Sequence, residues 1–148
     1  MKAIILAGIQ ASGKSSFCRQ QFFDTHIRLN LDMLRTRRRE AILLEACLAA
    51  QQPVLIDNTN PHSDDRRRYL NVLRAARYQV DCYYFPPDID GCLARNAGRD
   101  GKACIPDVAI LGTVSKWQTP SFAEGFDHLY TVKLLEGTFV VDEVMREI

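Results

Sequence analysis

A short apolar run that leads into a glycine-framed loop constrains this chain more than any other feature. Residues 4–6 are Ile-Ile-Leu, aliphatic without alternation, which predicts a buried parallel strand. Gly8, Gly13, Lys14 and Ser15 then fill the pattern G-x-x-x-x-G-K-[ST]. This pattern is typical of phosphate-binding loops when a strand precedes it and a helix follows it, and we expect that helix to begin at about Gly13.

Each position of the pattern has a physical reason. Glycine permits backbone angles at which successive N–H groups point inward at phosphate oxygens, and the N-terminal end of the next helix adds a partial positive charge. In such a loop Lys14 would reach the β- and γ-phosphates, and the hydroxyl of Ser15 would ligate Mg²⁺. We therefore expect a nucleoside triphosphate to bind at Gly8, Gln10, Ala11, Ser12, Gly13, Lys14, Ser15 and Ser16.

Length and charge narrow the class of protein. A chain of 148 residues is near the usual size of one domain, and we expect residues 1–148 to form a single domain. Its hydrophobic share of 47% is ordinary for a globular protein, which excludes a disordered or low-complexity chain. A net charge of +1 excludes a broad basic surface, so any contact with nucleic acid would be a local groove.

Cysteine and hydropathy patterns indicate a compartment. The five cysteines form no C-x-x-C pair and are an odd number, which favours reduced thiols over a zinc site or a disulfide framework. The N-terminal apolar run is too short for a signal peptide, and no apolar run approaches the roughly 18 residues that a membrane span needs. We expect a cytoplasmic protein without a membrane partner, whose oligomeric state stays open.

Strand and helix patterns alternate along the chain. Strands are predicted near residues 2–7, 27–30, 54–57, 79–85 and 128–135, with helices between them. Such alternation predicts a five-stranded parallel sheet with helices on both faces. The tail from Thr138 to Ile148 fits a strand or a short helix, and its period does not decide between them.

Two carboxylates stand where elements meet. Asp32 is at the start of a helix predicted to run to Gln51, and Arg35 follows at i+3, so both side chains are expected on one helix face. Asp57 ends the apolar strand 53–57, the position of a carboxylate on the Mg²⁺ side of a phosphate loop. The alternative for this turn is a polar helix cap, with Ser63 capping the helix that follows.

Arginine clusters have two interpretations. Residues 37–39 and 66–68 are Arg-Arg-Arg, and each run is predicted to be a solvated helix face. Arg95 and Arg99 instead flank the glycine-split stretch Gly98–Lys102, a candidate lid over the transferred phosphate. His26, His62 and His128 are isolated in the sequence and suggest no role of their own.

These motifs occur together in a known group of enzymes. The chain resembles the P-loop kinases of the polynucleotide 5′-hydroxyl kinase type, which include the kinase half of polynucleotide kinase–phosphatases and many short bacterial predicted kinases. The resemblance extends from Lys2 to about Val132. Its motifs are the phosphate loop, Asn30-Leu31-Asp32 with Arg35, Asp57-Asn58-Thr59-Asn60-Pro61, Arg95-Asn96 with Arg99, and Ala123-Glu124-Gly125-Phe126.

The resemblance implies a three-layer α/β/α P-loop NTPase fold of the small-kinase (nucleoside-monophosphate-kinase-like) group, with a lid, and ATP and Mg²⁺ as cofactors. Asp32 matches the general base that takes the proton of the attacking hydroxyl. Arg35 matches the residue that holds the acceptor's phosphate or positions that aspartate. Arg95 and Arg99 match lid arginines that neutralise the phosphoryl group in flight, and Lys14 completes the catalytic candidates.

The resemblance identifies fewer residues that would bind the hydroxyl acceptor. Thr59 and Asn60 match a turn that lines the acceptor pocket, and with Asp32, Arg35 and Asp57 they form the candidate substrate set. The family's loop often carries proline and glycine where this chain has Gln10 and Ala11. No phosphatase or ligase domain is attached to the 148 residues, which leaves the acceptor open.

Several functions remain. The first is a kinase that transfers the γ-phosphate of ATP to the 5′-OH of a polynucleotide or nucleotide. A single strand would need a basic groove with stacking aromatic side chains. One wall of this groove would be formed by Arg35, Arg38 and Arg39, and Trp117 or Tyr69 would stack on the bases. The alternatives are a kinase for a sugar, nucleoside, antibiotic or cell-wall precursor, or a nucleotide-dependent binding module or switch without turnover. A GTPase is disfavoured because the chain has no Asn-Lys-x-Asp motif.

Overall fold

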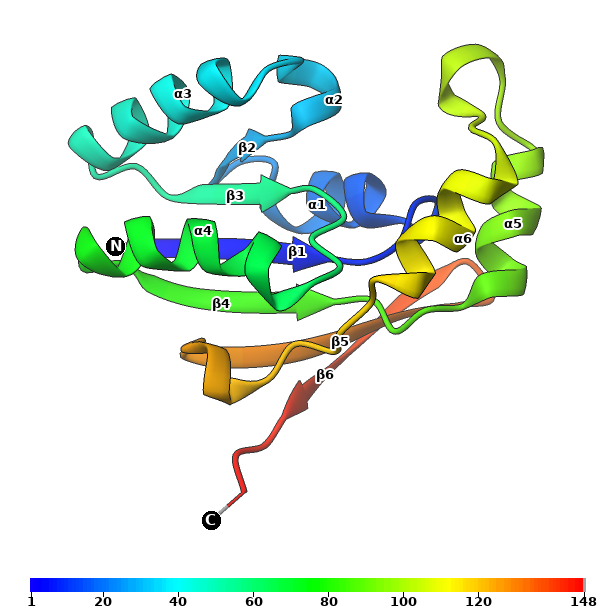
Figure 1. Ribbon diagram of the computed structural model, residues 1–148. Helices are drawn as coiled ribbons and strands as arrows, with labels where there is room; N and C mark the ends of the chain where they lie inside the picture. The colour runs from blue at the N-terminus through cyan, green and yellow to red at the C-terminus, as the bar shows by residue number, and fades with distance from the viewer. Residues whose placement is uncertain (148) are drawn as a thin grey trace.

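A computed structural model describes residues 1–147 and shows one sheet with helices on both faces (Figure 1). The six strands are ordered β2-β3-β1-β4-β5-β6. They are β1 (Lys2–Ala7), β2 (Ile27–Leu29), β3 (Val54–Asp57), β4 (Gln79–Tyr84), β5 (His128–Leu135) and β6 (Thr138–Val144). β1 is central and buried on both faces, as its unbroken apolar run predicts.

Helices occupy the connections between the strands. They are α1 (Lys14–Phe22), α2 (Leu31–Leu34), α3 (Arg37–Ala49), α4 (Ser63–Ala75), α5 (Ile89–Ala97) and α6 (Asp107–Ser115), with short 3₁₀ turns at Gly101–Ala103 and Phe122–Glu124. Leu44 of α3 and Leu73 of α4 pack with Ile5 on one face of the sheet, and Phe17 of α1 packs with Ile4 on the other. Figure 1 shows α3 and α4 on the near side of the sheet and α1 behind it.

The α/β fold is confirmed, but the sheet has six strands rather than five. β2, β3, β1, β4 and β5 are parallel, as expected, and β6 pairs antiparallel with β5. The turn between them is Glu136-Gly137, whose φ angles of 49° and 77° suit a tight hairpin. The tail is a strand from Thr138 to Val144, and Phe139 in it packs on Phe17 with ring centroids 5.4 Å apart; Ile148 lies outside the described residues.

The expected long helix after Asp32 is broken. α2 ends at Leu34, Arg35 takes a left-handed φ of 77°, and Thr36 caps α3 by accepting a hydrogen bond from the N–H of Arg39. The prediction that Asp32 and Arg35 share a helix face is therefore wrong, since Arg35 lies outside the helix. Helix propensity favoured one continuous helix, and the two local caps, Asn30 and Thr36, override it.

Two further expectations fail around α4. The N-cap is His62, not Ser63. The ring nitrogen of His62 accepts a hydrogen bond from the N–H of Asp64, and the carboxylate of Asp65 accepts one from the N–H of His62. His62 thus has a structural role that its isolation in the sequence concealed. Arg66, expected on a solvated face, is fully buried (0% exposed).

Arg66 fixes two loops to α4. Its guanidinium forms two hydrogen bonds with the carboxylate of Glu124, at 2.7 and 3.1 Å. It also donates to the carbonyl oxygens of Asn60 and Gln118, at 2.8 and 2.9 Å. The residue therefore joins the turn after β3 to the segment before β5.

Two simple expectations can be compared with the structure. The five cysteines are all unpaired within the described chain, which agrees with reduced thiols. Across residues 1–147, no helix has both the length and the apolar character that crossing a membrane requires.

We predict that Arg66→Ala lowers the free energy of unfolding by about 3–5 kcal/mol, because it leaves the carboxylate of Glu124 without its buried partner. Urea or guanidinium unfolding measures this change. Arg67→Ala is the matched control: its pair with Asp64 is solvent-exposed on both sides, so the change should stay within about 0.5 kcal/mol. Equal effects of the two substitutions would contradict this account of Arg66.

Candidate active site

The phosphate loop lies at the carboxyl ends of β1 and β3. The N–H of Gly8 donates to the carbonyl oxygen of Thr59 at 2.9 Å, which ties the loop to the turn after β3. A Cβ at Gly8 would meet the Cβ of Phe85 at 3.0 Å, and Gly13 has φ of 97° with the ring of Phe139 packed beside it. Both glycines are therefore required by the close packing around the loop.

Lys14 is buried inside this loop. Its Nζ donates to the carbonyl oxygens of Gly8 and Ile9 at 2.8 and 2.9 Å. Burial lowers the pKa of Lys14 to about 8, and the negative charges of Asp57 and Asp32 partly oppose that shift. The side chain is thus a desolvated cation at the position where the loop would receive phosphate oxygens.

Ser15 and Asp57, the two residues that the sequence suggests for a metal site, lie in contact with each other. The hydroxyl of Ser15 donates to Oδ2 of Asp57 at 3.0 Å, and Asp57 is only 1% exposed. Hydroxyl and carboxylate oxygens are ligands that Mg²⁺ accepts. No group of three or more His, Cys, Asp or Glu side chains that could hold a metal occurs among residues 1–147, so a cation here would need oxygens from a nucleotide as well.

Arg28 of β2 is the third member of this group. Its Nε lies 2.7 Å from Oδ2 of Asp57, and its Nη2 lies 3.1 Å from the hydroxyl of Ser15. Sequence analysis does not identify this residue, because a single arginine in a short strand matches no motif. Its role follows from the pairing of β2 with β3, in which Arg28 lies opposite Leu55, two residues before Asp57.

Two asparagines hold α2 against the end of β3. Asn30 caps α2 by accepting from the N–H of Met33, and its amide group donates to the carbonyl oxygen of Asp57 at 2.6 Å. In return, the amide oxygen of Asn58 accepts from the N–H of Leu31 at 2.9 Å. The backbone beside Asp32 is therefore joined to the backbone at Asp57 by two reciprocal side-chain hydrogen bonds.

A buried polar network supports Asn58. Its amide group donates to Glu40 at 3.2 Å and to the hydroxyl of Tyr69 at 3.1 Å, and that hydroxyl contacts both oxygens of Glu40. Arg37 adds a hydrogen bond to each of these two side chains. Burial and the nearby carboxylate of Glu40 raise the pKa of Tyr69 to about 12, so it remains a neutral hydroxyl that can donate and accept.

Asp32 lies on the same edge of the sheet as the phosphate loop. Its side chain is exposed, and its negative charge opposes, to a small extent, the lowering of the pKa of Lys14 by burial. Arg35 is also exposed, at the strained backbone position that ends α2. Strained residues of this kind are frequent at functional sites, and the geometry leaves both side chains free to contact a ligand.

Thr59 and Asn60 differ from the expectation that both line an acceptor pocket. Asn60 is 4% exposed, and its amide group donates to the carbonyl oxygen of Leu6 at 2.8 Å. Its side chain is therefore engaged in joining the turn to β1, in a left-handed backbone conformation that asparagine tolerates. Thr59 is half-buried and uses its carbonyl oxygen to hold Gly8.

Arg95 and Arg99, the two arginines expected in a lid, lie on α5 and just after it. Nε of Arg95 donates to the carbonyl oxygen of Ala11 at 2.6 Å, so this residue already contacts the phosphate loop. Arg99 is exposed, and its positive charge lowers the pKa of Lys14. Figure 1 shows the loop after α5 rising away from the sheet, with α6 returning toward it.

The loop's two departures from the family pattern are accommodated differently. Ala11 has φ of 62°, a left-handed conformation in which glycine is unstrained, and its carbonyl is held by Arg95. Gln10 reaches α6 instead, with its amide group donating to the hydroxyl of Thr113 at 2.9 Å. The side chain of Gln10 and the backbone carbonyl of Ala11 thus connect the phosphate loop to α6 and α5.

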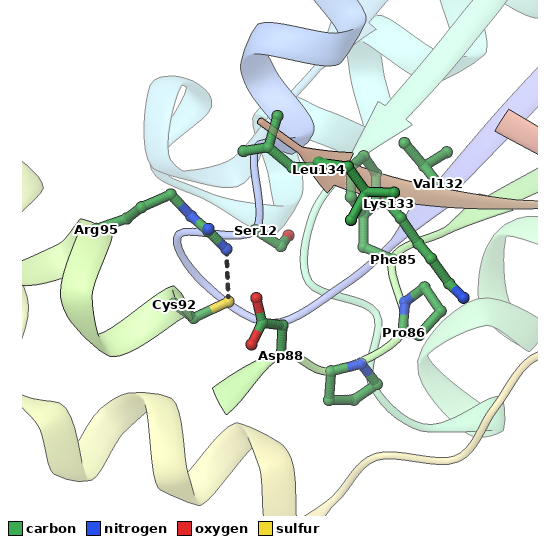
Figure 2. A pocket seen from close by; sticks show the side chains of 11 residues that line it. Ser12, Phe85, Pro86, Asp88, Cys92, Arg95, Val132, Lys133 and Leu134 are labelled. Carbon is green, nitrogen blue, oxygen red and sulfur yellow. Dashed lines mark hydrogen bonds between the residues drawn. The ribbon is translucent and has the colours of Figure 1, made fainter. Parts of the chain in front are cut away.

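A mostly apolar cavity of about 260 Å³ adjoins the phosphate loop (Figure 2). It opens between the segment after β4, represented by Phe85 and Pro86, and Leu134 of β5. Ser12 and Arg95 form its border with the loop, and Figure 2 shows Arg95 turned toward Cys92 there. Sequence reasoning missed this cavity because its walls come from segments that are distant along the chain.

The class of protein follows from the loop and the sheet together: the chain is a P-loop nucleotide-binding domain. A family model described as an AAA domain matches residues 4–111, and the chain belongs to that family.

Two curated proteins are similar along most of the chain. The bifunctional polynucleotide phosphatase/kinase of Schizosaccharomyces pombe is 25% identical over 133 residues, which cover 87% of this chain and 33% of that protein. A putative bifunctional polynucleotide phosphatase/kinase of Acanthamoeba polyphaga mimivirus is 25% identical over 151 residues, which cover 97% of this chain and 35% of that protein. The resemblance to polynucleotide kinases is confirmed, and the chain spans about a third of these relatives' length.

A solved structure supports the fold. Chaetomium thermophilum Kti12, determined in complex with ADP-AlF3, matches with a TM-score of 0.67 and 13% identity, covering 88% of this chain and 88% of that chain. At this identity the likeness concerns the fold alone.

We predict that the affinity for a nucleoside triphosphate falls as the pH rises through about 8. In the free protein Lys14 loses its proton there, whereas bound phosphate would stabilise the ammonium, so binding above this pH requires proton uptake. The expected loss is roughly tenfold per pH unit until the bound-state pKa is reached. Calorimetry between pH 7 and 9.5 measures it.

Lys14→Arg is the control for this titration, because a guanidinium keeps its charge throughout the range. Its affinity should show no step near pH 8, whatever its absolute value. A wild-type affinity that is constant up to pH 9.5 would contradict the lowered pKa of Lys14.

Proposed function

We propose that this protein is an ATP- and Mg²⁺-dependent kinase that transfers the γ-phosphate to a hydroxyl acceptor, the 5′-OH of a polynucleotide or nucleotide. One observation carries the proposal: Asp32 lies in the first turn of α2, and Asn30, the N-cap of that helix, donates to the carbonyl oxygen of Asp57 beside the phosphate loop. An exposed carboxylate at the edge of the sheet that carries the phosphate loop would be able to accept the proton of an alcohol.

The residues divide the reaction between them. Phosphoryl transfer needs positioning and charge neutralisation more than covalent chemistry, and Lys14, Arg95 and Arg99 supply fixed positive charge around the loop. Asp32 would accept the proton of the attacking hydroxyl, held in place through the contacts of Asn30 and Asn58. Mg²⁺, held by Ser15 and Asp57, would neutralise charge on the phosphates.

The cavity beside the loop suits the nucleoside of ATP. Its walls are mostly apolar, as for the flat face of a base, and its border with Ser12 leads to the phosphate loop. The carboxylate of Asp88 lines the cavity and would accept a hydrogen bond from a donor group on the base. A nucleotide extended from this cavity into the loop would present its γ-phosphate toward Asp32.

A polynucleotide acceptor is supported by two kinds of observation. Both curated relatives are polynucleotide phosphatase/kinases. On the Asp32 side, Arg35, Arg38 and Arg39 are exposed and can contact phosphates. The expected stacking by Tyr69 is excluded, since this ring is 2% exposed and its hydroxyl contacts Glu40.

We predict that Asp32→Asn lowers kcat by about 10²–10⁴-fold, since it removes the proton acceptor, while the affinity for ATP changes little. Transfer of a γ-³²P label and calorimetry measure the two quantities. Asp24→Asn, an exposed aspartate after α1, is the control and should leave both unchanged. A full rate of transfer by Asp32→Asn would show that another group is the base.

The acceptor is tested by labelling a panel. We expect 5′-OH DNA or RNA oligomers to accept the γ-phosphate, with nucleosides and sugars much poorer. Label that appears only on sugars or nucleosides would replace the polynucleotide by a small molecule. Binding of ATP without label transfer to any hydroxyl would instead support a binding module or switch.

A further inference from the structure

The proposed metal site contains a cationic side chain of the protein itself. Arg28 contacts both groups assigned to the metal: Oδ2 of Asp57 at 2.7 Å and the hydroxyl of Ser15 at 3.1 Å. Those two oxygens are themselves 3.0 Å apart. The guanidinium therefore makes the contacts that a divalent cation would make with the protein.

Charge balance explains why the guanidinium is there. Asp57 is 1% exposed, and a buried carboxylate is stable only with a partner that compensates its charge. Arg28 supplies that compensation in the nucleotide-free protein. If Mg²⁺ joined it, the two cations together would exceed the single carboxylate charge, so Arg28 and free Mg²⁺ exclude each other.

The protein offers Mg²⁺ too little to displace Arg28 unaided. Mg²⁺ gives up its water shell reluctantly and is usually bound through one or two carboxylates together with the phosphates of a substrate. Among residues 1–147, Asp57 is the one carboxylate in contact with Ser15. The phosphates of a nucleotide would add several negative charges and oxygen ligands, which reverses the balance in favour of the metal.

Arg28 has room to move aside. Its side chain is 33% exposed, and it stands on β2, the strand at the edge of the sheet. A groove of about 330 Å³ adjoins it, running from Ser15 along α1 toward Phe22 and His26. A displaced guanidinium would reach solvent in this groove without any change in the backbone.

We propose that Arg28 occupies the place of the divalent cation in the free protein, so that Mg²⁺ enters only together with the phosphates of a nucleotide. The proposal rests on the proposed function, in which Ser15 and Asp57 are the metal ligands. It makes Arg28 a positioning residue that sets the order of binding, and it assigns the residue no part in the transfer step.

The test measures thermal stability with MgCl₂ and no nucleotide. The test uses 10 mM MgCl₂, roughly ten times the dissociation constant of a weak site. The unfolding temperature of the wild-type protein should hardly change, whereas that of Arg28→Met should rise by about 3–6 °C, because Mg²⁺ then compensates the charge of Asp57. Adding Asp57→Asn to Arg28→Met should abolish that gain. Should Arg28→Met not fold, Arg28→Gln keeps a hydrogen-bond donor for Asp57 and should show the same response.

Two controls separate this effect from a general change of charge. Arg19→Met removes an arginine from the same groove, and it should respond to MgCl₂ as the wild type does. Arg28→Lys retains a cation beside Asp57 and should also remain unresponsive. The proposal is overturned if Arg28→Met or Arg28→Gln gains no more from MgCl₂ than the wild type, or if Arg19→Met gains as much.

Nucleotide binding distinguishes the failure of this proposal from the failure of the proposed function. Wild-type protein should be stabilised by ATP with MgCl₂ far more than by MgCl₂ alone. No stabilisation by ATP with MgCl₂ would overturn the proposed function as well as the role of Arg28. Stabilisation by ATP with MgCl₂, together with unresponsive Arg28 variants, would overturn the role of Arg28 alone.

Discussion

The buried ammonium group of Lys14 is the interaction on which the rest of this site depends. It donates to the carbonyl oxygens of Gly8 and Ile9, so the ammonium group that would bind phosphate also stabilises the curvature of the loop. Burial weakens its hold on the proton, and the carboxylate of Asp57 opposes that loss. The loop thus encloses a desolvated ammonium group. Its hydrogen bonds to carbonyl oxygens can be exchanged for hydrogen bonds to phosphate oxygens, which are stronger because the acceptor is charged.

Two carboxylates on different elements, Asp57 and Asp32, oppose the lowering of the pKa of Lys14. The amide side chains of two asparagines fix the backbone positions of these carboxylates relative to each other. Asn30 and Asn58 exchange hydrogen bonds between the start of α2 and the end of β3. Asp57 is buried and needs a compensating cation, which Arg28 supplies here, whereas Asp32 is exposed. The roles proposed for these two aspartates differ because their surroundings differ.

The sequence predicts what is local. The phosphate loop, the five parallel strands and the alternation with helices could be predicted because each depends on spacing within a short segment. The sequence did not predict the burial of Arg66 or the contact of Arg28 with Asp57, since the partners lie 58 and 29 residues away. The break at Arg35 was missed because a strong helix composition concealed the caps on either side of it, and the sixth strand because its residues fit either period.

The most direct test of this account is a crystal structure with Mg²⁺ and a non-hydrolysable ATP analogue. The account predicts phosphates on the loop at Gly8–Ser15, the ammonium of Lys14 released from its carbonyls to the phosphates, and Asp32 facing the γ-phosphate across a gap that fits one hydroxyl group. Phosphates bound away from this loop, or a carboxylate of Asp32 turned away from the γ-phosphate and replaced there by another residue, would contradict it.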